Sequence, residues 1–99
     1  MPNKHGTAFV YTVHELKIIP MYFDDVLTKR KMFEVRKNDR DFHVGDKLIL
    51  REYEDGVYTG RVCKRWVQYV FHGTGLYGLQ PGYCVLGISE DINDANKPT

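Results

Sequence analysis

The residues most able to do chemistry lie in one short segment, KRKMFEVRKNDRDF, which spans residues 29–42. Residues 29–40 hold six basic and two acidic side chains, so this part of the chain is locally positive. If residues 32–36 are extended, Glu34 and Arg36 project from the same face, because side chains alternate between the two faces of a strand. The pair is then either a solvated ion pair worth about 0–1 kcal/mol or part of an anion-binding site.

The anion-binding hypothesis places basic side chains along a cleft and aromatic side chains nearby, where they stack on a nucleobase. Four basic residues would line this cleft: Lys17, Lys31, Arg36 and Arg40. The contacts expected with a nucleic acid or nucleotide come from six residues: Lys17, Lys31, Glu34, Arg36, Lys37 and Arg40. On spacing alone the simpler interpretation stays open, in which Arg36, Lys37 and Arg40 form a solvated turn.

The charge of the whole chain limits how it can bind a polyanion. Fourteen Lys and Arg residues face thirteen Asp and Glu residues, which gives a net charge of +1 with neutral histidines. This balance excludes a polycation that binds nucleic acid over its whole surface. A confined basic cleft is compatible with it, because acidic residues near the C-terminus, such as Glu90 and Asp91, offset the basic segment.

The sequence offers no convincing metal or cofactor site. Cys63 and Cys84 do not form a Cys-x-x-Cys pair and the four histidines are scattered, so we expect buried reduced thiols and no bound metal. Residues 73–78, GTGLYG, match the glycine spacing of a dinucleotide-binding loop. That motif requires a helix to begin at its third glycine, whereas residues 79–82, LQPG, break helices. We therefore expect no cofactor.

The elements that must position these residues are mostly strands. Period-two alternation predicts strands at residues 10–18, 32–36, 47–53, 57–62, 63–71 and 83–88. Pro20 fits the first turn of a short helix whose apolar stripe contains Tyr22, Phe23, Val26 and Leu27. Five or six strands and one main helix predict a mainly β (α+β) fold, either a small barrel or a strongly curved sheet.

The length of 99 residues is that of one domain. We expect a flexible N-terminal segment at residues 1–8, the domain at residues 9–88 and a polar C-terminal tail at residues 89–99. No apolar run approaches the roughly 20 residues of a membrane helix, and the N-terminus lacks a signal-peptide pattern. We therefore expect a cytoplasmic protein without a membrane partner, and the sequence leaves its oligomeric state open.

Several segments resemble a family of small uncharacterised bacterial and phage proteins in the ASCH group, which is similar in fold to PUA domains. The resemblance covers roughly residues 14–88. It rests on HELKI (14–18), YFDDVL (22–27), FEVRKNDRDFHVGDKLILREY (33–53), YTGR (58–61) and PGYCVLGI (81–88). It implies a PUA-like β-barrel with a cleft beside the helix, and a role in binding RNA or a nucleotide.

Some relatives in the ASCH group look like amidohydrolases that act on N4-acetylcytidine with a lysine, a threonine nucleophile and a glutamate. Lys31 matches the lysine, but Glu34 stands at the threonine position, and a carboxylate does not replace a hydroxyl nucleophile there. Lys29 and Met32 also depart from the glycine and the small hydroxyl residue usual in the family. An enzyme acting on an N4-acylated cytidine-like nucleoside would therefore use Lys31 and Glu34 as an acid/base pair.

Three functions follow from these observations. We expect first a binding module for RNA, single-stranded nucleic acid or a nucleotide. The first alternative is the amidohydrolase with Lys31 and Glu34 as catalytic residues. The second alternative is a domain that binds a protein partner through exposed aromatic side chains.

Overall fold

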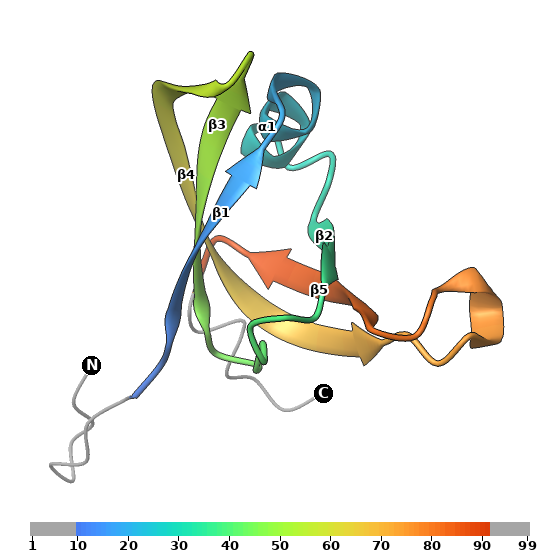
Figure 1. Ribbon diagram of the computed structural model, residues 1–99. Coiled ribbons are helices and arrows are strands. Elements are labelled where there is room, and N and C mark those ends of the chain that lie inside the picture. Colours follow the sequence, from blue (N-terminus) through green and yellow to red (C-terminus); the bar gives the residue numbers. More distant parts are fainter. Residues whose placement is uncertain (1–9, 92–99) are drawn as a thin grey trace, which may run out of the picture.

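The computed structural model describes residues 10–91, which form one curled sheet and one α-helix (Figure 1). The elements, in chain order, are β1 (Val13–Ile18), α1 (Pro20–Leu27), β2 (Phe33–Lys37), β3 (Lys47–Glu54), β4 (Val57–His72), the 3-10 turn η1 (Leu76–Gly78) and β5 (Tyr83–Ser89). The mainly β fold with one short helix after the first strand is the fold class that the sequence predicts.

The five strands lie in the order β1-β3-β4-β5-β2. β1 runs parallel to β3, and the other neighbouring pairs are antiparallel. β4 is 16 residues long and belongs to both halves of the sheet, because its first half pairs with β3 and its second half with β5. The sheet curls into a half-barrel, which brings the two edge strands β1 and β2 towards each other beside α1 (Figure 1).

Helix α1 is short and packs on the sheet through two side chains. Pro20 occupies its first turn, where a fixed φ favours the helix and the missing N–H costs nothing. Phe23 and Val26 are fully buried, and each contributes roughly 1.5–3 kcal/mol by leaving water. Tyr22 and Leu27, which the apolar stripe assigned to the same face, are instead about half exposed. The helix therefore contacts the core along a narrower stripe than the sequence predicts.

Two arginines of β4 fix the position of α1 over the sheet. The buried Arg65 donates from Nη2 to the carbonyl oxygen of Val26 over 3.0 Å, at the C-terminal end of the helix. Arg61 bridges from Asp24 of the helix, at 2.9 Å, to the buried carboxylate of Glu52 on β3, at 3.3 Å. These contacts hold the helix that forms one wall of the cleft described below.

Several boundaries differ from those expected. Residues 57–62 and 63–71, predicted as separate elements, form the single strand β4. Ser89, assigned to the polar tail, is the last residue of β5 and is buried. The segment 1–8 and most of the tail lie outside the described residues. Among residues 10–91, no helix has the length and apolar character needed to cross a membrane.

Candidate functional site

A cleft of about 600 Å³ lies where the end of β1, helix α1 and strand β2 meet. Its position follows from the fold, because the helix covers only part of the opening between the two edge strands of the half-barrel. The lining residues are Lys17, Ile18, Ile19, Tyr22, Asp25, Arg30, Lys31, Phe33, Glu34, Val35 and Arg36. The cleft therefore combines aromatic, aliphatic and charged side chains.

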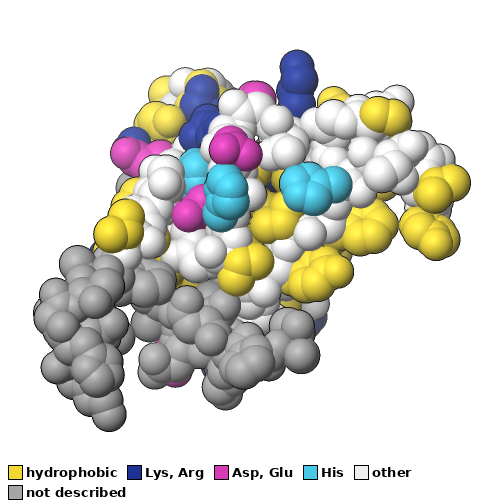
Figure 2. Space-filling view, turned by 90° about the horizontal axis from the view of Figure 1, so that it is seen from below, with side chains coloured by type: hydrophobic (Ala, Val, Ile, Leu, Met, Phe, Trp, Pro, Cys, Tyr) yellow, Lys and Arg dark blue, Asp and Glu magenta, His cyan; other side chains and the backbone are white. Residues whose placement is uncertain are grey.

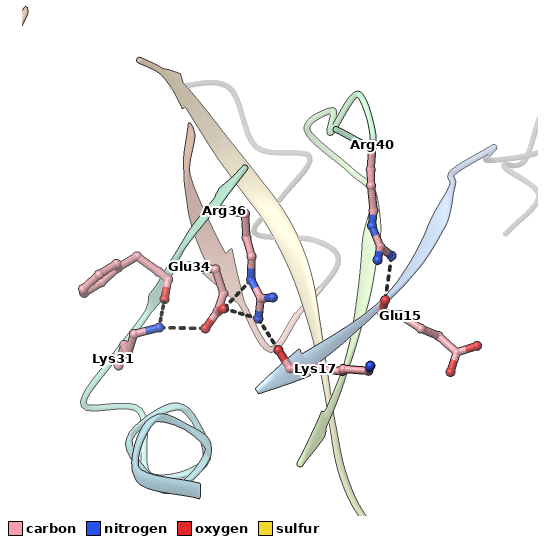
Figure 3. A network of polar contacts seen from close by, with 7 residues as sticks. Glu15, Lys17, Lys31, Glu34, Arg36 and Arg40 are labelled. Carbon is pink, nitrogen blue, oxygen red and sulfur yellow. Dashed lines mark hydrogen bonds and ion pairs between the residues drawn. The ribbon is translucent and has the colours of Figure 1, made fainter. Parts of the chain in front are cut away.

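Glu34 is the central polar residue of the cleft. It is 3% exposed, whereas its neighbours Phe33 and Val35 are 44% and 50% exposed, so the alternation of β2 turns Glu34 inward. Its Oε1 accepts from Lys31 Nζ at 2.7 Å, and its Oε2 accepts from Arg36 Nε and Nη2 at 3.0 and 2.8 Å (Figure 3). A buried carboxylate needs such partners, because the loss of water is otherwise uncompensated.

Lys31 is held at the mouth of the cleft by several contacts at once. Besides Glu34, its Nζ donates to the carbonyl oxygen of Phe33 over 2.8 Å. The ammonium group also lies 4.9 Å from the centre of the Phe33 ring and 5.2 Å from that of Tyr22. Both distances are those of cation–π contacts. One cation and two rings are thus fixed side by side.

Two arginines, Arg36 on β2 and Arg40 in the loop after it, reach the backbone of β1. Nη2 of Arg36 donates to the carbonyl oxygen of Lys17 at 2.8 Å, and Nη1 of Arg40 donates to that of Glu15 at 2.6 Å (Figure 3). Both carbonyls belong to the edge strand β1, whose backbone groups on that side would otherwise be open to another strand. At these two carbonyls, arginine side chains therefore supply the hydrogen bonds that a neighbouring strand would otherwise donate.

The structure brings together four of the six residues predicted to bind nucleic acid. Lys31 and Arg36 each contact Glu34, and Lys17 joins them through its backbone carbonyl, which accepts from Arg36. The Lys17 side chain points away from Arg36 (Figure 3), and its Nζ lies 4.4 Å from the centre of the Tyr53 ring.

Two predicted residues lie elsewhere. Arg40, expected in the cleft lining, is absent from it because its side chain is used on β1. Lys37, the last residue of β2, does not line the cleft either.

The sequence interpretation expected aromatic side chains near the cleft but did not identify which ones form its walls. Tyr22 was assigned to the buried stripe of the helix, yet it is 44% exposed and lies beside Lys31. Phe33 was expected only as part of the strand at residues 32–36. Arg30 and Asp25, which form an ion pair of 3.0 Å in the lining, carried no signal beyond the local charge. An exposed aromatic next to the basic segment is the clue that could have found them.

No group of three or more His, Cys, Asp or Glu side chains within residues 10–91 is arranged to hold a metal ion. The described cleft therefore offers cations, rings and one buried carboxylate as its chemical groups.

Comparison with known proteins identifies relatives of this chain. A family model described as "Domain of unknown function (DUF3850)" matches residues 13–88, from the first residue of β1 to the last but one of β5. An uncharacterised 12.9 kDa protein in the GpA 3′ region of Escherichia phage P2 is 51% identical over 49 residues. The matched part is 50% of this chain and 45% of the phage protein, so the match spans less than half of that relative.

Proposed function

The chain belongs to the DUF3850 family, and we propose that it binds a nucleotide or single-stranded nucleic acid in the cleft beside α1. The observation that carries this proposal is the placement of Lys31, whose ammonium lies between the rings of Tyr22 and Phe33. A nucleotide presents a phosphate and a flat base, which pair with a cation and an aromatic ring respectively. The resemblance to the ASCH group points in the same direction.

The charge of the lining also suits a small anion. The basic lining residues are Lys17, Arg30, Lys31 and Arg36, and the acidic ones are Asp25 and Glu34. Because Glu34 contacts two cations, one positive charge at the centre of the cleft is left without a carboxylate of its own. The cleft volume of about 600 Å³ lies within the range usual for small-ligand sites.

The rings at the mouth of the cleft leave surface for a base. Tyr22 and Phe33 are each 44% exposed, although both lie against Lys31. Stacking of one base on an aromatic side chain is worth about 1–3 kcal/mol. A phosphate bound by Lys31 would bring the attached nucleoside within reach of either ring.

A binding experiment tests this proposal. Affinities for mononucleotides are measured by calorimetry, and affinities for random RNA and single-stranded DNA by fluorescence anisotropy, each over a series of salt concentrations. We expect log Kd to depend on log salt with a slope of about 0.7 per phosphate contact. Lys31→Met should weaken binding by roughly tenfold, the loss of one charge-assisted contact.

The matched control is Lys64→Met, because Lys64 is an exposed lysine of β4 outside the cleft lining. This substitution should leave the affinity within twofold of the unsubstituted protein. An absence of binding at low salt, an affinity independent of salt, or equal losses in the two variants would each contradict the proposal.

One observation favours a second candidate, the amidohydrolase. Lys31 Nζ and Glu34 Oε1 are 2.7 Å apart, which is the contact that an acid/base pair requires. Both carboxylate oxygens already accept from cations, so Glu34 must release one of them before it can take a proton from an attacking water. Hydrolysis of the N4-acyl bond would then release a carboxylic acid and the free exocyclic amine.

Incubation with N4-acylated cytidines, followed by chromatography, tests this second candidate. We expect an enzyme to show turnover that is lost in both Lys31→Ala and Glu34→Gln. An absence of turnover at high protein concentration, with mononucleotide binding intact, would contradict the amidohydrolase and support only the binding function.

A further inference from the structure

The outward face of β2, β5 and the second half of β4 carries apolar side chains that the core does not use. The register aligns them in rows across the three strands: Phe33, Gly87 and Tyr69 in the first, and Val35, Val85 and Phe71 in the second. Tyr83, opposite Lys37, extends the surface. We call these residues the aromatic face. Seen from below, hydrophobic side chains gather over this part of the sheet and on the loop beyond it (Figure 2).

In the first row a glycine stands between two exposed aromatic side chains. Phe33 and Tyr69 are 44% and 56% exposed, and Gly87 between them has no side chain. Two strand spacings separate the backbones of Phe33 and Tyr69 by about 9.5 Å. No ring contact joins these two side chains among the described residues. We call this gap, walled by two aromatics above a glycine, the Phe33–Tyr69 slot.

Gly87 keeps the slot open for a steric reason. A Cβ at this position would lie 3.3 Å from the Cβ of Tyr69 and 3.7 Å from Cγ of Gln68. The backbone of Gly87 lies in a conformation open to any residue, since its φ is not positive. The φ angle of Gly87 does not require a glycine, but the close approach of Tyr69 favours one, and the strand surface at Gly87 therefore carries no side chain of its own.

The charge around the aromatic face suits a polyanion. Among the described outward positions of these strand segments, Lys37 is charged and none is a carboxylate. Lys31 lies over the Phe33 ring at one end. The acidic residues near the two ends, Glu90 and Asp39, each contact a basic side chain. Exposed aromatics on a sheet without acidic neighbours are the arrangement on which single-stranded nucleic acids stack their bases.

We propose that the Phe33–Tyr69 slot binds one base of a single-stranded nucleic acid whose neighbouring nucleotide occupies the cleft. This inference rests on the proposed function and names its ligand as a strand of two or more nucleotides. Phe33 makes the connection, because it both lines the cleft and forms one wall of the slot. An aromatic ring has two faces, and Lys31 lies over one of them.

The test compares ligands of increasing length. Affinities are measured for a mononucleotide, a dinucleotide and a tetranucleotide of one base, as RNA and as DNA. We expect the affinity to rise about tenfold or more between the mononucleotide and the tetranucleotide, the effect of one additional stacked base. A 2-aminopurine placed in the strand should lose fluorescence on binding, because stacking on aromatic rings quenches it.

Two variants separate the slot from the cleft. Tyr69→Ala removes one wall, and Gly87→Val fills the gap with a residue that strands favour. Both should abolish the gain with length and remove the part of the quenching that arises in the slot, while leaving the mononucleotide affinity within twofold. The matched control is Tyr58→Ala, which removes a tyrosine 44% exposed near the other end of β4. If Gly87→Val fails to fold, Tyr69→Ala carries the test alone, because its side chain is mostly in solvent.

Each outcome separates the two proposals. Mononucleotide binding with no gain in longer strands overturns the slot and leaves the cleft function intact. A lack of binding to any ligand overturns both. A third outcome is a dimer that dissociates on dilution and in Tyr69→Ala, together with an affinity that does not increase with strand length. This result identifies the aromatic face as a protein interface and also overturns the slot.

Discussion

Two buried carboxylates of the half-barrel, Glu34 and Asp46, have similar exposure and different partners. Glu34 in the cleft is 3% exposed and Asp46 before β3 is 5% exposed. Asp46 accepts from the ring of His14 at 2.8 Å and from the backbone N–H groups of Thr12 and His43 at 3.3 and 3.0 Å. Glu34 accepts from the side chains of a lysine and an arginine.

The difference between these partner sets separates a structural site from one that can bind a ligand. Backbone N–H groups cannot move without unfolding the loop, so Asp46 ties the start of β1 to the turn that precedes β3. The side chain of His14 is enclosed further by Phe42, whose ring centre lies 4.7 Å away. Lysine and arginine side chains can turn towards a ligand while their backbones stay in place. Equal burial therefore does not imply equal roles.

The largest effect is expected from Asp46→Ala. This substitution leaves three donors without their acceptor, and one of them is the buried ring of His14. We expect it to lower the free energy of unfolding by about 3 kcal/mol. Urea denaturation followed by circular dichroism measures the change. Ligand affinity of the folded fraction should not change, because Asp46 lies outside the cleft.

The control for this prediction is Asp39→Ala, an exposed acid of the same loop whose contact with Arg40 is 3.9 Å long. It should change stability by less than about 0.5 kcal/mol. If Asp46→Ala proved as mild as its control, the comparison between the two carboxylates would lose its basis.

A smaller change in stability and a larger one in binding are expected from Glu34→Gln. The amide keeps the shape, and Lys31 and Arg36 can reach solvent, so we expect a loss of about 1–2 kcal/mol. Removal of the negative charge should raise the affinity for a mononucleotide severalfold at low salt and steepen its salt dependence. Calorimetry over a salt series measures both.

The matched substitution Asp46→Asn should leave ligand affinity unchanged at every salt concentration. A loss of affinity in Glu34→Gln, with the fold retained, would mean that the carboxylate itself contacts the ligand. That result would favour the acid/base interpretation of Glu34 over the binding module.

The sequence predicts more of the fold than of the cleft. Period-two alternation places the strands, and the two-residue spacing of Glu34 and Arg36 puts them in contact, as observed. Pairing order depends on contacts between distant residues, such as β2 with β5, for which local pattern has no signal. For the same reason the alternation at residues 57–71 could not show that one strand serves both halves of the sheet.

Side-chain direction accounts for most of what sequence could not predict. Arg40 and Lys17 belong to the predicted cleft by charge, yet one reaches the backbone of β1 and the other lies over Tyr53. The role of Asp46 has no local signal, because its partner His14 is 32 positions away. Both cases depend on long-range neighbours that only the folded chain brings together.

The two cysteines extend the comparison to buried groups that have no full counter-charge. Burial raises the pKa of the Cys63 thiol, with a partial opposing effect from Arg65, and burial also raises the pKa of Cys84, to which Asp39 adds. A buried thiol without an opposite charge to compensate for the loss of water stays protonated and therefore neutral. In the unfolded chain the thiols lose their protons near the ordinary pKa of 9.0, whereas in the folded chain they keep them to a higher pH. The free energy of unfolding should therefore fall as pH rises from about 9 through the raised pKa.

Denaturation midpoints of the unsubstituted protein and of a Cys63→Ala, Cys84→Ala double variant, measured from about pH 7 to pH 10, test this smallest effect. Other groups also titrate in this range, but they are common to both proteins and cancel in the difference. The double variant should start from a lower midpoint, because two buried side chains are truncated, and should then lose less with rising pH. Parallel curves would mean that the buried thiols lose their protons as easily in the folded as in the unfolded chain. The core would then accommodate its buried ionisable groups in two ways only among those compared, by backbone donors as at Asp46 and by cationic side chains as at Glu34, and not by keeping thiols protonated.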